Sequence, residues 1–207
     1  MIRRLNVDCL FTIGYSWINI NEFPSILHKY NINVIVDVRS LPYSQRFPDF
    51  NRENLKSILK RNRINYIFMG KEFGARRNES DVYDDGVVDF NRVFQSKLFL
   101  EGVKRVEEGL QDGYTISFLC SEKDPLDCHR TIMISQYFSK IGLKICHIIE
   151  GSKMKTQRDI EDELLQKHFK KEIGQRSLFD DMNDLISKAY KKQNILIGYK
   201  KEGEDYD

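Results

Sequence analysis

Short runs of apolar residues alternate along this chain with segments in which apolar residues recur at helical spacing. The runs are rich in β-branched and aromatic residues and predict strands at 10–14, 34–38, 64–69, 114–120 and 143–149. The amphipathic segments predict helices at 21–30, from about 52, at 91–111 and at 129–141, the last closed by Gly142. Strands that alternate with helices form βαβ units with a parallel sheet. We therefore expect an α/β fold, a three-layer sandwich with about five mostly parallel strands.

Two parts of the chain depart from this alternation. Residues 70–89 form a long polar stretch, and a loop of that length inside a domain is usually functional or mobile. After the last predicted strand the composition shifts toward charge, and helices are expected at about 156–171 and 181–192. We therefore divide the chain into an α/β domain at 1–151 and a helical appendage with a charged tail at 152–207. The apolar faces of the appendage helices can pack on the sheet domain or contact a protein partner.

The composition narrows the class of protein without identifying a ligand. The chain has 207 residues, a formal net charge of +2 and 41% hydrophobic residues, so that a real core is expected and DNA binding by bulk charge alone is excluded. No stretch of about 18 apolar residues predicts a membrane span, and the first residues lack the apolar run of a signal peptide. We therefore expect a cytoplasmic protein with no membrane contact. In that compartment its four irregularly spaced cysteines are expected to be free thiols, metal ligands or catalysts rather than a disulfide scaffold.

The candidate chemistry lies where the strands end, because parallel α/β sheets bind ligands at the carboxyl ends of their strands. The strongest cluster is Cys120-Ser-Glu122-Lys-Asp-Pro-Leu-Asp-Cys128-His129-Arg130, which runs from a strand end into the first turn of a helix. A cysteine at such a helix start can have its pKa lowered from about 8.5 to roughly 3.5–7.5, and Arg130 can bind phosphate or carboxylate with two hydrogen bonds. One interpretation therefore makes Cys120 or Cys128 a nucleophile. His129 or Glu122 would then move protons.

Two other interpretations of this segment stay open. Cys120, Cys128 and His129 could bind a metal, but the paired C-x2-C spacing of structural zinc sites is absent. In addition, the adjacent Cys128 and His129 side chains should diverge in a helix. Alternatively, the thiols are buried and structural, with Arg130 paired to Asp37 or Glu122. On this basis we assign neither a metal nor a cofactor.

Asp37, Arg39 and Ser40 stand at the end of the strand predicted at 34–38. A charged Asp in an otherwise apolar strand must be paired, and it can orient an arginine or act as a general base. The alternative is a salt bridge to Arg39 or Arg130 that only holds the loop. We take Asp37 as a candidate catalytic residue, and Arg39 and Ser40 as candidate ligand-binding residues.

Two further candidate ligand-binding segments follow the first and third strands. Gly14 permits close backbone approach, Ser16 can donate to an anion, and Tyr15 can stack on a base. The G-x-G-x-x-G pattern is absent, so no dinucleotide site is expected, and the alternative is a simple turn with Tyr15 packed. Lys71 to Arg77 could form a cationic rim that suits a nucleotide or single-stranded nucleic acid, or it could be a solvated charged face. The other cations of such a rim would be Arg39, Arg46, Arg52 and Lys123.

The motifs at Thr12–Ser16, Val36–Ser40 and Leu119–Arg130 together resemble the domain-of-unknown-function family numbered 488. The resemblance runs from about residue 10 to 150, and it implies a small prokaryotic α/β domain without an established reaction. This chain departs from the family at Lys71–Gly74, where the family pattern is Leu-Gly-Gly, and so it lacks the double glycine.

Together these residues predict an intracellular enzyme that acts on a phosphate-bearing ligand such as a nucleotide or nucleic acid. Arg39 and Arg130 would clamp the anion. Asp37 or Glu122 would act as acid or base, and a cysteine would be the nucleophile if the chemistry is covalent. The alternative hypothesis is a non-catalytic nucleotide- or nucleic-acid-binding module that works with a protein partner through its C-terminal helices.

Overall fold

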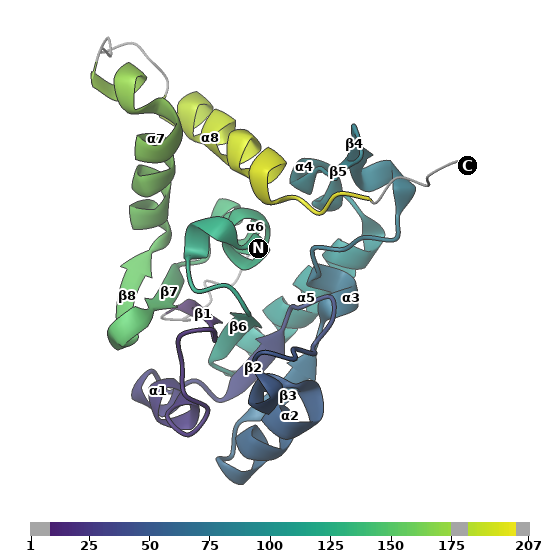
Figure 1. Ribbon diagram of the computed structural model, residues 1–207, viewed down its shortest axis with the longest axis vertical. Coiled ribbons are helices and arrows are strands. Elements are labelled where there is room, and N and C mark those ends of the chain that lie inside the picture. The colour runs from purple at the N-terminus through teal and green to yellow at the C-terminus, as the bar shows by residue number, and fades with distance from the viewer. Residues whose placement is uncertain (1–8, 175–181, 202–207) are drawn as a thin grey trace.

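A six-stranded sheet lies at the centre of the computed structural model, which describes residues 9–174 and 182–201 (Figure 1). The strands are β1 Leu10–Gly14, β2 Val34–Asp37, β3 Asn65–Phe68, β6 Ile116–Cys120, β7 Ile145–Ile149 and β8 Lys153–Thr156. They lie in the order β3-β2-β6-β1-β7-β8, and all neighbours are parallel except β7 and β8. The expected α/β fold with a mostly parallel sheet is therefore confirmed.

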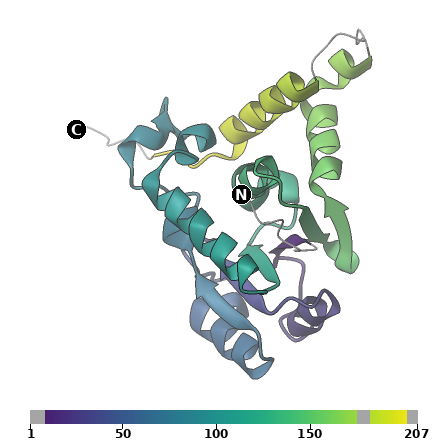
Figure 2. The same ribbon diagram turned by 180° about the vertical axis from the view of Figure 1, so that it is seen from behind.

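Helices cover both faces of the sheet and give the three layers that the sequence predicts. They are α1 Phe23–Lys29, α2 Arg52–Arg61, α5 Lys97–Gln111, a π-helical segment at Arg130–Ser135 and its continuation α6 Gln136–Lys140. Ile35 and Leu119 point toward α1 and α2, whereas their neighbours Val36 and Phe118 point toward α5 and α6. This alternation explains why β2 and β6 read as continuous apolar runs, since both faces are buried. Figure 2 shows α5 in front of the sheet.

Two long helices follow the sheet, as the sequence predicts. They are α7 Gln157–Gly174 and α8 Met182–Ile197. Ile160, Leu164 and Tyr190 join the same core as α5 and α6, so that the two helices pack on the sheet domain (Figure 1). The predicted start of the second helix at Asp181 and the charged tail after Lys201 lie outside the described residues. Among the helices that are described, none is long and apolar enough to cross a membrane.

The expected helical appendage begins instead with a strand. Gly151 and Ser152, with φ angles of 74° and 53°, turn the chain back after β7, and β8 then pairs antiparallel with it. Three of the four side chains of β8 are exposed. An exposed edge strand has little apolar pattern, and its sequence therefore gives no strand signal.

The polar stretch at 70–89 is not a structureless loop, which corrects that expectation. It contains α3 Gly70–Phe73, a 3-10 turn at Ser80–Val82 and a hairpin of β4 Tyr83–Asp84 with β5 Val87–Val88. Phe73, Val82 and Val88 are buried in the core beside α5 and hold the segment in place. The single helix predicted at 91–111 is also divided, into α4 Phe90–Val93 and α5, because Ser96 caps the start of α5.

A disulfide joins Cys9 to Cys146, with 6.1 Å between their Cα atoms. The two lie side by side because β1 pairs with β7, where Phe11 stands opposite Cys146. The expectation that all four cysteines are unpaired is therefore wrong for these two. Their separation of 137 residues gives no signal of the pairing in the sequence. Cys120 and Cys128 are free thiols.

Candidate functional site

Three of the predicted clusters meet at one edge of the sheet because the strands that carry them are neighbours. β2, β6 and β1 lie side by side, with Gly14 opposite Cys120 and Asp37 opposite Leu119. The carboxyl ends of these strands therefore lie together, which is the usual place for a ligand in a parallel sheet.

Gly14 lets the segment after β6 pass directly over the end of β1. The backbone N–H of Tyr15 donates to the carbonyl of Cys120 at 3.1 Å, and the backbone N–H of Ser16 donates to the carbonyl of Ser121 at 3.1 Å. A Cβ atom on Gly14 would lie 1.8 Å from the carbonyl oxygen of Glu122. The absence of a side chain at Gly14 is therefore needed by the protein's own backbone.

Asp37 and Arg39 form a closed, buried ion pair. The guanidinium donates to Asp37 from Nε at 2.9 Å and from Nη2 at 2.6 Å, and also to the carbonyl of Phe50 at 3.0 Å. Tyr66 donates its hydroxyl to Asp37 at 2.7 Å. Burial alone would lower the pKa of Arg39, but the hydrogen bond and charge of Asp37 raise it above its usual value. This geometry matches the alternative in which the pair holds the loop, and it leaves Arg39 few donors for an anion.

Tyr15 is packed rather than open to a ligand, which corrects its assignment as a stacking residue. Its ring is 2% exposed and stacks on Phe50, with 4.4 Å between the ring centroids. The Arg39 guanidinium lies 5.1 Å from the ring centroid, and Arg39 also donates to the Tyr15 hydroxyl at 3.2 Å. Both polar and apolar parts of the side chain are therefore used within the protein.

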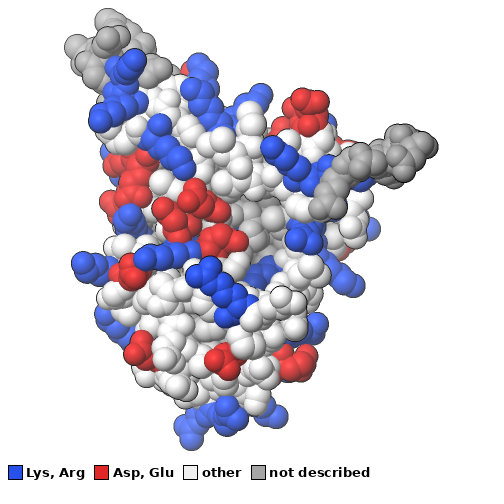
Figure 3. All heavy atoms as spheres, in the orientation of Figure 1, with Lys and Arg blue, Asp and Glu red and all other residues white. Residues whose placement is uncertain are grey.

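The basic side chains of the predicted cationic rim make separate contacts within the protein. The guanidinium groups of Arg46, Arg52 and Arg76 lie over Phe47, Phe68 and Tyr199, and Lys123 forms an ion pair with Glu150 at 2.6 Å. The hydroxyl of Ser40 accepts the N–H of Arg76 at 2.9 Å, while Lys71 is exposed. On the face shown in Figure 3, basic and acidic side chains are interspersed. These contacts favour the solvated charged face over one continuous basic surface.

Four side chains with metal-ligating or acid–base atoms converge where β6 ends. They are Cys120, Glu122, Cys128 and His129, and one ligand atom from each lies within 4.8 Å of all the others. We call them the Cys-Glu-His cluster. Oε2 of Glu122 accepts hydrogen bonds from both thiols at 2.9 Å, and Sγ of Cys120 lies 3.7 Å from Nδ1 of His129. Both thiols and the imidazole are buried.

The backbone between the two cysteines explains this convergence. Asp124 caps a 3-10 turn at Pro125–Asp127, which brings the chain back toward the end of β6. Cys128 then has extended backbone angles, with φ −130° and ψ 133°, whereas His129 has helical angles. The two adjacent side chains therefore do not follow helical geometry, and the expectation that they diverge is wrong.

The protonation of the cluster differs from what the helix start predicts. Burial raises the pKa of the Cys128 thiol well above its usual range, so that the expected lowering of a cysteine pKa does not apply there. Burial alone would also raise the pKa of Glu122, but the charge of His129 and the two thiol hydrogen bonds lower it to about 2. Burial would lower the pKa of His129, but its interactions with Cys128 and Glu122 raise it.

Arg130 lies beside the cluster and is completely buried. Its Nη1 donates to the backbone carbonyl of Glu122 at 2.7 Å. Its Nε and Nη2 have no hydrogen-bond partner among the described residues. Within the described part of the chain, Arg130 also forms no ion pair with Asp37 or with the carboxylate of Glu122. A buried guanidinium with two unpaired nitrogens is costly, which makes Arg130 the least satisfied polar group at this edge.

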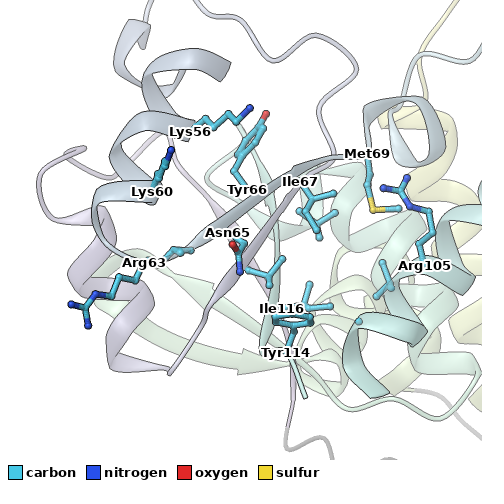
Figure 4. A pocket seen from close by; sticks show the side chains of 15 residues that line it. Lys56, Lys60, Arg63, Asn65, Tyr66, Ile67, Met69, Arg105, Tyr114 and Ile116 are labelled. Atoms are coloured by element: carbon cyan, nitrogen blue, oxygen red, sulfur yellow. The ribbon is translucent and has the colours of Figure 1, made fainter. Parts of the chain in front are cut away.

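A separate cavity of about 800 Å³ lies along the edge strand β3, and the sequence reasoning did not find it (Figure 4). Its floor is apolar and includes Ile67 and Ile116, and Tyr66 and Tyr114 also line it. Figure 4 shows Lys56 and Lys60 on one side of Ile67 and Arg105 on the other. The available signal was the four-residue spacing of Lys56 and Lys60, which places both on one face of the helix predicted from about residue 52.

The fold and the Cys-Glu-His cluster define an α/β protein with a candidate site after β6. The family described as "Domain of unknown function DUF488" matches residues 19–137, which include Asp37, Arg39 and the whole cluster. The chain therefore belongs to this family, as the sequence motifs predict. No curated protein and no solved structure matches the chain.

Proposed function

We propose that this protein is an enzyme that acts on a phosphate-bearing ligand such as a nucleotide or nucleic acid at the carboxyl ends of β1, β2 and β6. The Cys-Glu-His cluster carries this proposal, because four reactive side chains within 4.8 Å of one another are more than packing requires. Arg130 is the group that would attract the phosphate, since its Nε and Nη2 have no partner among the described residues. The paired Arg39 would position the neighbouring loop instead.

Two chemistries fit this cluster. In a covalent route Cys120 is the candidate nucleophile, and Nδ1 of His129, 3.7 Å from its Sγ, is the group that would take its proton. The raised pKa of Cys128 makes that thiol a poor nucleophile at neutral pH. In a metal-assisted route both thiols would be ligands, and a bound ion would supply Lewis-acid chemistry.

A ligand screen followed by a turnover assay tests the proposal. We expect phosphate, nucleotides or short oligonucleotides to raise the Tm, since a ligand at 100 times its Kd stabilises by about 2.7 kcal/mol. The responding compound should then be converted to a product that chromatography resolves. Arg130→Met should abolish both effects, whereas the control Arg158→Met, an exposed arginine outside the cluster and outside the cavity, should retain them. Turnover that survives in Arg130→Met, or no response to any phosphate compound, would contradict the proposal.

The cavity beside β3 favours a second function, that of a non-catalytic binding module. Lys56 and Lys60 could hold phosphate groups while Tyr66 or Tyr114 stacks on a base. In this case a Lys56→Met, Lys60→Met variant should lose the Tm response and Arg130→Met should keep it. Binding without any conversion of the compound would support this function over catalysis.

A further inference from the structure

We propose that the Cys-Glu-His cluster is a zinc site in which Cys120, Cys128, His129 and Glu122 bind one Zn²⁺ ion. The inference concerns the site of the proposed function but does not depend on catalysis, because a binding module could hold the same ion. Two thiolates, an imidazole and a carboxylate are ligands that zinc accepts, and soft sulfur ligands select it over calcium or magnesium.

The distances in the cluster suit a tetrahedral ion. Zinc–sulfur bonds of about 2.3 Å and zinc–nitrogen or zinc–oxygen bonds of about 2.0–2.2 Å place neighbouring ligand atoms about 3.3–3.8 Å apart. Sγ of Cys120 and Nδ1 of His129 are already 3.7 Å apart. The two contacts of Glu122 with the thiols, at 2.9 Å, are thiol hydrogen bonds that open slightly once the protons leave to solvent and the ion takes their place.

The orientation of His129 independently indicates a metal ligand. Its Nε2 lies 3.0 Å from the backbone carbonyl of Val38, which can only accept a hydrogen bond. Nε2 therefore carries a proton, and in the neutral ring Nδ1 holds a lone pair 3.7 Å from Sγ of Cys120. A ligating histidine that donates its other ring N–H to a backbone carbonyl is the usual outer-shell arrangement of protein zinc sites.

The charges around the cluster also balance when zinc is present. Two thiolates and the Glu122 carboxylate carry three negative charges, against two positive charges on the ion. The buried guanidinium of Arg130, held by the carbonyl of Glu122, supplies the remaining positive charge.

Metal content and cobalt substitution of the full-length protein test this proposal. We expect the protein expressed with zinc to contain about one equivalent after desalting, and to lose it to a strong chelator. Cobalt added to the metal-free protein should give thiolate-to-cobalt charge-transfer absorption together with the intense visible bands of a tetrahedral ion.

Four variants, one of them a control, test the ligand assignment. Cys128→Ser should reduce the charge-transfer absorption to about half, since one of two thiolates is lost, while Glu122→Gln should keep it and weaken retention of the ion. The control Cys9→Ser, Cys146→Ser removes the other two cysteines and should leave metal content and spectrum unchanged. A metal-free wild-type protein that gives no cobalt spectrum would overturn the proposal. So would zinc retained in full by a Cys120→Ser, Cys128→Ser variant. The wild-type measurements decide the matter even if a variant fails to fold.

Discussion

Replacing Asp37 by asparagine tests the buried ion pair between Asp37 and Arg39. From the sequence, Asp37 was interpreted either as a catalytic residue or as part of a salt bridge that holds the loop. The carboxylate is 0% exposed and accepts hydrogen bonds from the Arg39 side chain, the Arg39 backbone N–H and the Tyr66 hydroxyl. The substituted amide would retain the shape and one acceptor oxygen, but it would place an NH₂ group against the donors of Arg39. The variant therefore removes the charge and leaves the guanidinium buried without a counter-ion.

The burial of the ion pair sets the size of the expected loss in the free energy of unfolding. Removing one partner of a buried pair costs about 3–5 kcal/mol, because the remaining charge stays desolvated. For a chain of 207 residues this corresponds to a fall in Tm of about 6–20 °C. Replacing both members with apolar residues, as in Asp37→Val, Arg39→Met, should recover part of the loss, since no uncompensated charge then remains.

Urea denaturation followed by circular dichroism measures these differences as changes in midpoint at constant slope. The matched control is Asp84→Asn, which breaks the exposed pair with Arg92 and should cost at most about 1 kcal/mol. A loss below about 1 kcal/mol for Asp37→Asn would refute the view that the pair is a structural element. A double variant as unstable as the sum of its two single variants would refute it as well.

Three more predictions follow from the described contacts. Burial and the charges of Arg130 and Lys155 lower the pKa of His147 to about 3 in the folded protein. In the unfolded chain the pKa of this side chain is about 6.5. Between about pH 6.5 and pH 3 the unfolded chain therefore binds a proton at His147 that the folded protein does not bind. Stability is therefore complete above about pH 6.5 and should fall by about 2 kcal/mol at about pH 5, and His147→Gln should flatten this profile in denaturation measured against pH. Cys146→Ser opens a 137-residue loop and should cost up to about 5 kcal/mol in oxidising buffer and nothing under full reduction, as thermal melts in the two buffers can show. Gly14→Ala sets a Cβ against the Glu122 carbonyl and should lower stability by about 1–3 kcal/mol, and an unchanged Tm would contradict the close approach.

The parts of the fold that the sequence predicted are those that depend on local periodicity. Val34 to Val38 and Ile116 to Cys120 are buried on both faces of the sheet, and their largely apolar runs identify them as strands. β8 could not be found in this way, because its exposed side chains carry no pattern and its pairing is set by the turn at Gly151. The disulfide between Cys9 and Cys146 likewise depends on the order of the strands in the sheet. This order cannot be predicted from the local pattern of apolar residues.

The strand ends were predicted as the location of the site, but the function of each side chain there was not. Strand adjacency follows from βαβ topology, and it brings Asp37 and Cys120 to one edge. Whether Asp37 or Tyr15 faces a ligand depends instead on which side chains of the protein pack against it. Phe50, from the segment before α2, stacks on Tyr15 and accepts from Arg39, and nothing in the spacing of these residues indicates that contact.

The geometry of Cys128 and His129 shows why spacing alone gave a wrong expectation for these two side chains. They were expected to share one helix, in which neighbouring side chains point apart. The helix begins one residue later, so Cys128 keeps an extended backbone and its thiol turns toward Glu122. Nε2 of His129 is held by a carbonyl at the end of β2, which orients Nδ1 toward the same point. The proposed ligand set comes from the end of β6, the loop that follows it and the start of a helix. It therefore lacks the short paired spacing by which zinc sites built on a single turn are recognised.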